Sequence, residues 1–104
     1  MKYLGNYYKQ PAEAIPSGRW GVDFDPDIIA GETISSGTIV VYDKDGTNVT
    51  TTLTSGTHTV AGTTLSIAYK GGTAGEVYYA VHKVVTNAGG TYEGEVRIYI
   101  FDIP

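Results

Sequence analysis

Several residue types and patterns are missing from this sequence. It contains no cysteine, so disulfides and thiolate metal sites are excluded. No run approaches the roughly 18 consecutive apolar residues of a membrane-spanning helix, and the first residues lack the apolar core of a signal peptide. We therefore expect no membrane insertion, and a protein made in the cytoplasm without a signal peptide.

Positive charge is also scarce. Seven Lys and Arg residues are scattered among eleven Asp and Glu, which gives a net charge of −4. A protein that follows a phosphate backbone needs a stripe or patch of basic side chains. The sequence therefore predicts that nucleic acid is not a partner.

Helical periodicity is absent as well, and strand signals take its place. Fourteen glycines separate segments rich in Thr, Val, Ile and Tyr, and the 104 residues suffice for one core. Such segments recur about every 8 to 12 residues, which predicts an all-β antiparallel sandwich of about seven strands. The expected strands cover residues 20–24, 33–42 with a bulge or bend at 35–37, 47–53 near an edge, 58–60, 63–69, 76–86 and 91–101.

The last two expected strands form the longest pair, joined by a glycine turn at residues 87–90. Val96, Ile98 and Ile100 share one face of the final strand and are predicted to be core. Lys83 assigns one face of the partner strand to solvent, because an unpaired lysine is almost never fully buried.

The outer face of this hairpin is then unusually apolar. A contiguous apolar patch on a soluble protein is typical of an interaction surface. Two alternatives remain open: the patch contacts another protein chain, or loops and the N-terminal residues cover it. The predicted interaction residues on this face are Tyr79, Val81, Val85, Tyr99 and Phe101.

Residues 1–18 differ from the rest and are interpreted as an N-terminal arm, with the sandwich domain at 19–104. Pro11 and Pro16 lack the N–H that a central strand needs. The arm is either a mobile tail or a segment that packs onto its own domain or a neighbouring subunit. Three tyrosines favour packing, since aromatic rings are costly to leave in water, and they join the predicted interaction residues. They are Tyr3, Tyr7 and Tyr8.

No catalytic, cofactor-binding or metal-binding site is expected. His58 and His82 are far apart, without metal-ligand spacing, and His82 is predicted to be a hydrogen-bonded core residue. The serines lack a nucleophile-elbow motif. The turn at residues 43–48 has two aspartates but fails the pattern of a calcium loop, so a hairpin turn is favoured. Weak cation binding by Asp23, Asp25 and Asp27 is the minor alternative.

Several short motifs occur together along the chain. They are Lys9-Gln10-Pro11-Ala12-Glu13, Val22-Asp23-Phe24, Gly31-Glu32-Thr33-Ile34-Ser35, and Gly71-Gly72-Thr73-Ala74-Gly75 before the strand that Tyr78 leads. In this combination the chain resembles a family of small phage and prophage virion structural proteins with an immunoglobulin-like β-sandwich. The resemblance implies that fold and no catalytic residues.

The expected function is therefore that of a non-enzymatic phage or prophage structural protein. It would act through contacts with other virion proteins or with copies of itself, in the neck, on the capsid surface or in a tail or fibre component. It would be made in the host cytoplasm and end in the virion. The alternative is a sandwich module that binds a carbohydrate or cell-surface ligand, with Trp20, Tyr42 or Tyr92 stacking on a sugar.

Overall fold

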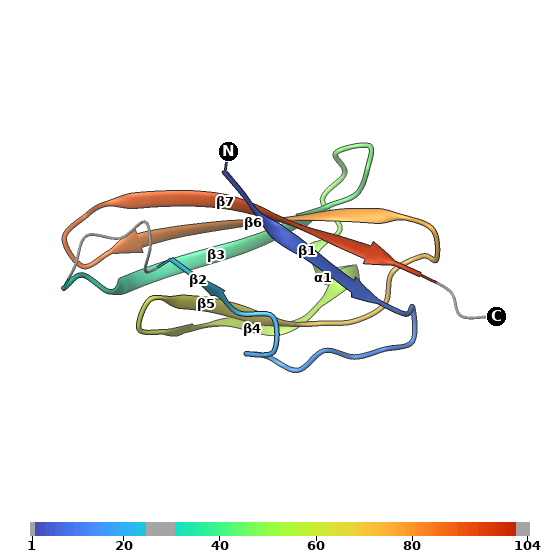
Figure 1. Ribbon diagram of the computed structural model, residues 1–104, viewed down its shortest axis with the longest axis horizontal. Helices are drawn as coiled ribbons and strands as arrows, with labels where there is room; N and C mark the ends of the chain where they lie inside the picture. The colour runs from blue at the N-terminus through green and yellow to red at the C-terminus, as the bar shows by residue number, and fades with distance from the viewer. Residues whose placement is uncertain (1, 25–30, 102–104) are drawn as a thin grey trace.

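The fold is a two-layer β-sandwich, as predicted. The computed structural model describes residues 2–24 and 31–101, and the side chains from Gly5 onward within them. In this part of the chain seven strands form two sheets, one above the other in Figure 1. The strands are β1 (Lys2–Lys9), β2 (Val22–Asp23), β3 (Ile34–Tyr42), β4 (Thr54–Ala61), β5 (Thr64–Tyr69), β6 (Val77–Thr86) and β7 (Thr91–Ile100).

The predicted hairpin forms the centre of the larger sheet, whose order is β1-β7-β6-β3. Strands β6 and β7 pair antiparallel from Val77 opposite Tyr99 to Val85 opposite Thr91. Gly89, at φ +88°, turns the chain, and the Thr86 hydroxyl accepts a hydrogen bond from the Gly90 N–H at 3.0 Å. Strand β3 adds on the other side of β6, with the predicted irregularity between Ile34 and Ser36.

The smaller sheet has the order β2-β5-β4. Only two residues of the first expected strand pair with β5, Val22 with Leu65 and Asp23 with Thr64. Phe24 extends this edge, because its N–H donates to the Thr63 carbonyl at 2.8 Å. The short strand follows from the sequence: beyond Phe24 comes an Asp-Pro pair, and proline cannot donate to a ladder.

The core lies between the two sheets and contains the three residues predicted for it on the final strand. Leu65, Ile67 and Tyr69 of β5 are buried and face the other sheet, where Val96, Ile98 and Ile100 are buried. Burial of apolar area is the main favourable term in folding, so this interface holds the sandwich together. Trp20 is half-buried and packs against the core at its edge.

The N-terminal residues differ most from the expectation of an arm. Lys2–Lys9 is strand β1, which pairs parallel with β7 along its length, with a register shift between Tyr3 and Gly5. The prolines do not prevent this pairing, since both follow β1 in the sequence. Residues 2–9 are thus an edge strand of the larger sheet.

The expected strand at residues 47–53 is wrong. Asn48 makes one bridge to Tyr42, and α1 (Thr50–Leu53) then forms a single helical turn. The Asn48 side-chain oxygen accepts hydrogen bonds from the Thr50 N–H at 3.0 Å and from the Thr50 hydroxyl at 2.7 Å. Such an Asx turn competes with the ladder, and it bends the chain before a strand can form.

A glycine pair tests the packing of the two sheets. Gly72 and Gly89 both have positive φ, at +102° and +88°. A Cβ added at Gly72 would lie 2.7 Å from Cδ1 of Ile100, whereas a Cβ added at Gly89 would have no atom of the described residues within 4 Å. We expect Gly89→Ala to lower the free energy of unfolding by about 1 kcal/mol through backbone strain. Gly72→Ala should lower the free energy of unfolding by ~1–3 kcal/mol more than Gly89→Ala does, because its new methyl group overpacks the contact with Ile100. Urea denaturation measures both, and equal losses would contradict the described packing at Ile100.

Candidate protein interaction surface

The solvent-facing side of the β1-β7-β6-β3 sheet, called the outer face below, gathers most of the predicted interaction residues. Across β6 and its neighbours, Tyr79 lies opposite Tyr42 of β3 and Arg97 of β7. One row further along the strands, Val81 lies opposite Val40 and Glu95. Tyr79, Val81 and Val85 are each half-buried, so their side chains still reach solvent.

Sequence analysis missed Val40 and Tyr42 as members of this face. Both are half-buried and pair with Val81 and Tyr79 across the β3–β6 ladder. Val40 and Tyr42 alternate along β3 with the core residues Ile39 and Val41, and this alternation is the sequence signal that assigns them to the outer face. The bulge near Ser35 hid it, because a one-residue shift exchanges the two faces of a strand.

Aromatic rings gather where the C-terminal end of β7 meets β1. Tyr8 stacks on Tyr99, with ring centroids 5.2 Å apart and planes at 18°. Tyr8 is 61% exposed and Phe101, just beyond β7, is 39% exposed. The Phe101 N–H donates to the Lys9 carbonyl at 2.9 Å, which holds this residue beside β1. These rings extend the apolar part of the outer face toward the sheet edge.

Of the other two N-terminal tyrosines, only Tyr7 has a described side chain, and this side chain does not add to the surface. Tyr7 lies on the inner face of β1, where its ring stacks on Trp20 at a centroid distance of 4.7 Å and an interplanar angle of 7°. Burial raises the pKa of the Tyr7 phenol. Trp20 in turn contacts Tyr69 at 5.4 Å. The side chain of Tyr3 lies outside the described residues.

Charged side chains interrupt the apolar patch. Arg97 forms an ion pair with Glu95 at 3.3 Å, and its guanidinium carbon lies 5.8 Å from the Tyr79 ring centroid. The hydrogen bond to Glu95 raises the pKa of Arg97. Lys83 lies opposite Glu93 in the β6–β7 register. The outer face therefore combines apolar and charged groups and is less uniformly apolar than the sequence predicts; this mixture is common in non-obligate interfaces.

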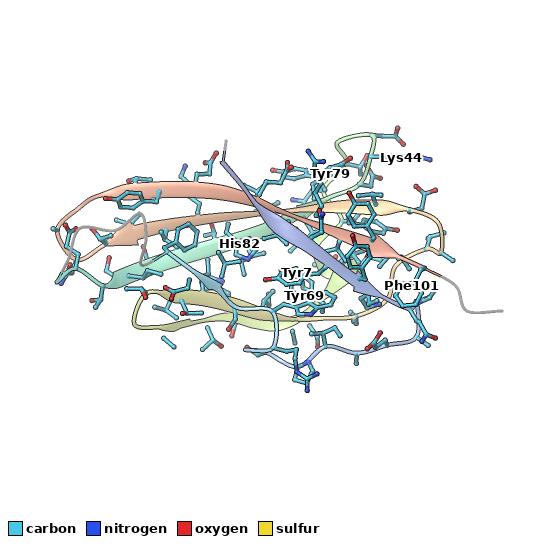
Figure 2. All side chains as sticks on the ribbon, viewed as in Figure 1. Tyr7, Lys44, Tyr69, Tyr79, His82 and Phe101 are labelled. Atoms are coloured by element: carbon cyan, nitrogen blue, oxygen red, sulfur yellow. The ribbon has the colours of Figure 1, made fainter. Side chains whose placement is uncertain are left out.

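A groove crosses one end of the outer face, beside the turn at residues 43–46. It has a volume of about 540 Å³ and is shallow. Tyr42, Tyr79 and Val81 line its floor, and Asp43, Lys44, Gly46 and Glu95 border it. Figure 2 shows Tyr79 and Lys44 at the same end of the larger sheet.

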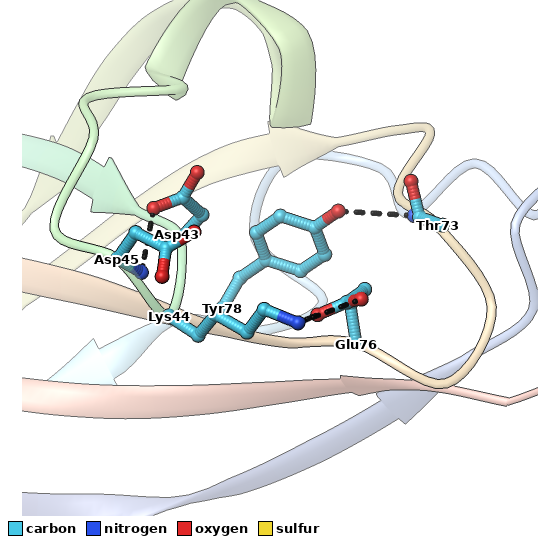
Figure 3. A network of polar contacts seen from close by, with 6 residues as sticks. All are labelled: Asp43, Lys44, Asp45, Thr73, Glu76 and Tyr78. Carbon is cyan, nitrogen blue, oxygen red and sulfur yellow. Dashed lines mark hydrogen bonds and ion pairs between the residues drawn. The ribbon is translucent and has the colours of Figure 1, made fainter.

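The turn that borders the groove is held by its own hydrogen bonds. Oδ1 of Asp43 accepts from the N–H groups of Asp45 and Thr47, both at 2.9 Å. The Asp43 carboxylate thus stabilises the predicted turn by accepting hydrogen bonds from its backbone, as short acidic side chains commonly do. Lys44 reaches Glu76 at 3.2 Å and so ties the turn to the start of β6 (Figure 3). The hydrogen bond to Glu76 raises the pKa of Lys44.

His82 is a core residue, as predicted. Its side chain is fully buried on the inner face of β6, and Nδ1 lies 3.2 Å from the Ala80 carbonyl. Nε2 has no hydrogen-bond partner in the part of the chain that the structure describes. Burial lowers the pKa of His82 from 6.5 to about 4, with the Ala80 hydrogen bond opposing the shift. His58 is exposed on β4, so the two histidines lie in different sheets.

The candidate cation residues lie mostly outside the described part of the chain. Asp23 accepts a hydrogen bond from the Thr63 hydroxyl at 2.7 Å, and Asp25 and Asp27 lie outside the described residues. In residues 2–24 and 31–101, no group of three or more His, Asp or Glu side chains is arranged to hold a metal ion. No helix in that same part of the chain is long and apolar enough to span a membrane.

Most of the chain matches a known protein family. A protein-family model described as "Podophage GP4 fiber-tail adaptor protein gp77" matches residues 9–99. The chain belongs to this family. No curated protein matches the chain. Membership of a phage adaptor family makes the chain a phage virion structural protein, as the sequence resemblance indicated, and implies contacts with other virion proteins.

The buried His82 predicts a specific pH dependence. The unfolded chain binds a proton at this residue below about pH 6.5, whereas the folded chain does so only below about pH 4. The contribution of His82 to stability is therefore constant above pH 6.5 and is lost as the pH falls from 6.5 to 4, by roughly 3 kcal/mol in total at 1.36 kcal/mol per unit.

The measurement is the free energy of unfolding between about pH 5 and 6.5, where carboxylates titrate little. His82→Leu should remove the slope in this window. His58→Asn, which keeps His82, should retain it and serves as the control. An unchanged slope in His82→Leu would contradict the buried neutral histidine.

Proposed function

We propose that the protein is a non-enzymatic adaptor of the phage tail and fibre region, which joins other virion proteins through its outer face. The observation that carries this proposal is the outer face itself. Tyr8 and Phe101 remain exposed there, next to half-buried Tyr99 and Tyr79, because β1 extends the sheet sideways. Exposed aromatic groups of this kind are enriched where proteins bind one another.

The family description supports the location. It names a fiber-tail adaptor of podophages, which favours a tail or fibre component over the neck or capsid surface. Partners would be other virion proteins, with copies of the same chain as an additional possibility, and not nucleic acid. A stable contact of this type buries upwards of about 1,000 Å² in total.

We also propose that the sandwich is immunoglobulin-like. Support comes from the strand order: three strands, β2-β5-β4, face a sheet in which β3, β6 and β7 are neighbours. An immunoglobulin domain has the same arrangement of its second, fifth and fourth strands against its third, sixth and seventh. In this proposal β1 is a first strand that pairs with the last one.

The carbohydrate-binding alternative has less support. Trp20 lies between Tyr7 and Tyr69, and Tyr92 packs against the core, so neither ring offers a free face near a loop end. Sugar-binding sites rely on such rings for stacking. Tyr42 lies in the groove of the outer face, where it also fits the adaptor proposal.

The proposal predicts the effect of charge on the outer face. The double variant Val81→Asp/Tyr99→Asp should reduce incorporation of the protein into particles by at least about tenfold, because an unpaired carboxylate buried in an interface costs more than ~1.4 kcal/mol. Immunoblots of purified particles measure incorporation. Thr57→Asp, at an exposed position of β4, is the matched control and should incorporate normally.

Urea denaturation of each purified variant separates loss of contact from loss of fold. Both outer-face positions are half-buried, so the double variant should remain folded. Normal incorporation of the folded double variant, together with failure of Thr57→Asp, would place the contact on the other sheet and overturn the proposal.

A further inference from the structure

The groove beside the turn at residues 43–46 differs from the rest of the outer face in shape and in charge. Its floor is the ring of Tyr79, the ring of Tyr42 and the side chain of Val81. Its volume of about 540 Å³ lies within the range of pockets that hold ligands, and leaves room for a few side chains. A groove of this shape admits part of an extended segment.

Both sides of the groove are fixed before any partner arrives. On one side, the Asp43 N–H donates to the Thr47 carbonyl at 3.0 Å and the Gly46 N–H donates to the Asp43 carbonyl at 3.1 Å. The Lys44–Glu76 ion pair holds this turn against β6. On the other side, Arg97 lies over Tyr79 and is paired with Glu95. Binding to a preformed groove avoids much of the cost of ordering it.

The charges around the groove leave an excess of carboxylate. Lys44 is paired with Glu76, and Arg97 with Glu95, so each of these cations already has an anionic partner. Asp43 and Asp45 belong to the same turn and take part in none of the ion pairs within the described residues. The whole chain carries a net charge of −4, which adds to the attraction of a positive partner.

We propose that this groove binds an extended segment of another virion protein that carries apolar side chains next to Lys or Arg. The apolar side chains would lie on Tyr42, Tyr79 and Val81, and the basic groups would approach Asp43, which borders the groove. Charge complementarity favours this partner over a neutral saccharide, which would gain nothing from the carboxylate excess. The proposal rests on the proposed adaptor function and names the chemistry of its partner.

Two matched peptides test the chemistry on the full chain. The probes are acetyl-Leu-Arg-Tyr-Arg-Leu-amide and acetyl-Leu-Glu-Tyr-Glu-Leu-amide, with maltose as the saccharide. In titrations followed by ¹⁵N–¹H correlation spectra, the basic peptide should shift the amides of Gly46, Tyr79 and Val81. It should bind about fivefold or more tightly than the acidic peptide, and this preference should shrink as salt is added.

Val81→Lys should remove these shifts, since it places a cation on the apolar floor and repels the basic peptide. Val85→Lys is the matched control, because Val85 is half-buried on the same face of the same strand but outside the groove. The control should bind the basic peptide as the wild type does. Spectra of both variants report directly whether they are folded.

Three results would overturn the proposal: equal binding of the two peptides, shifts only outside the groove, or maltose binding with no peptide effect.

The adaptor function is tested separately from the groove chemistry. If the basic peptide selects the groove but outer-face variants still enter particles normally, the groove chemistry stands and the adaptor function is wrong. If the variants are excluded from particles but the peptides do not discriminate, the function stands and the groove chemistry is wrong.

Discussion

The parallel pairing of β1 with β7 determines which surface this protein can offer. The pairing runs from Lys2 opposite Gly94 to Lys9 opposite Ile100. Two contacts fix the C-terminal end of β1. The ammonium group of Lys9, fully buried, donates to the carbonyls of Gln10 and Gly71, and the ring of Tyr7 stacks on Trp20. A buried lysine is tolerated only when its donors are satisfied, and here backbone carbonyls satisfy them.

This arrangement has a consequence for the outer face. Because β1 lies beside β7, its residues widen the sheet and leave the hairpin surface open. Alternation along β1 sends Tyr7 inward to Trp20 and Tyr8 outward to Tyr99. The same strand thus closes the core at its edge and adds an aromatic ring to the surface that we propose for virion contacts.

The sequence predicts the parts of the fold that depend on local alternation. The β6–β7 hairpin, the core residues of β7 and the buried His82 are all confirmed, since a two-residue period and one exposed lysine suffice to assign the faces. β1 was missed because Tyr, Gly and Asn near the N-terminus show no period, and its place depends on a partner about ninety residues away. The α1 turn has a local cause, the Asn48 side chain that accepts from Thr50, but the threonine-rich run around it favours a strand. The groove depends on a turn and three strands, so no single segment carries its signal.

The proposed virion contacts require that the outer face is open in the isolated protein and covered in the particle. Carbene footprinting, read by mass spectrometry on the free protein and on assembled particles, tests it most directly. The account predicts that peptides containing Tyr79, Val81 and Tyr99 are labelled in the free protein and protected in the particle, while labelling of Thr54–Ala61 on β4 stays unchanged. Unchanged labelling of the outer face, with protection confined to β4, would contradict it.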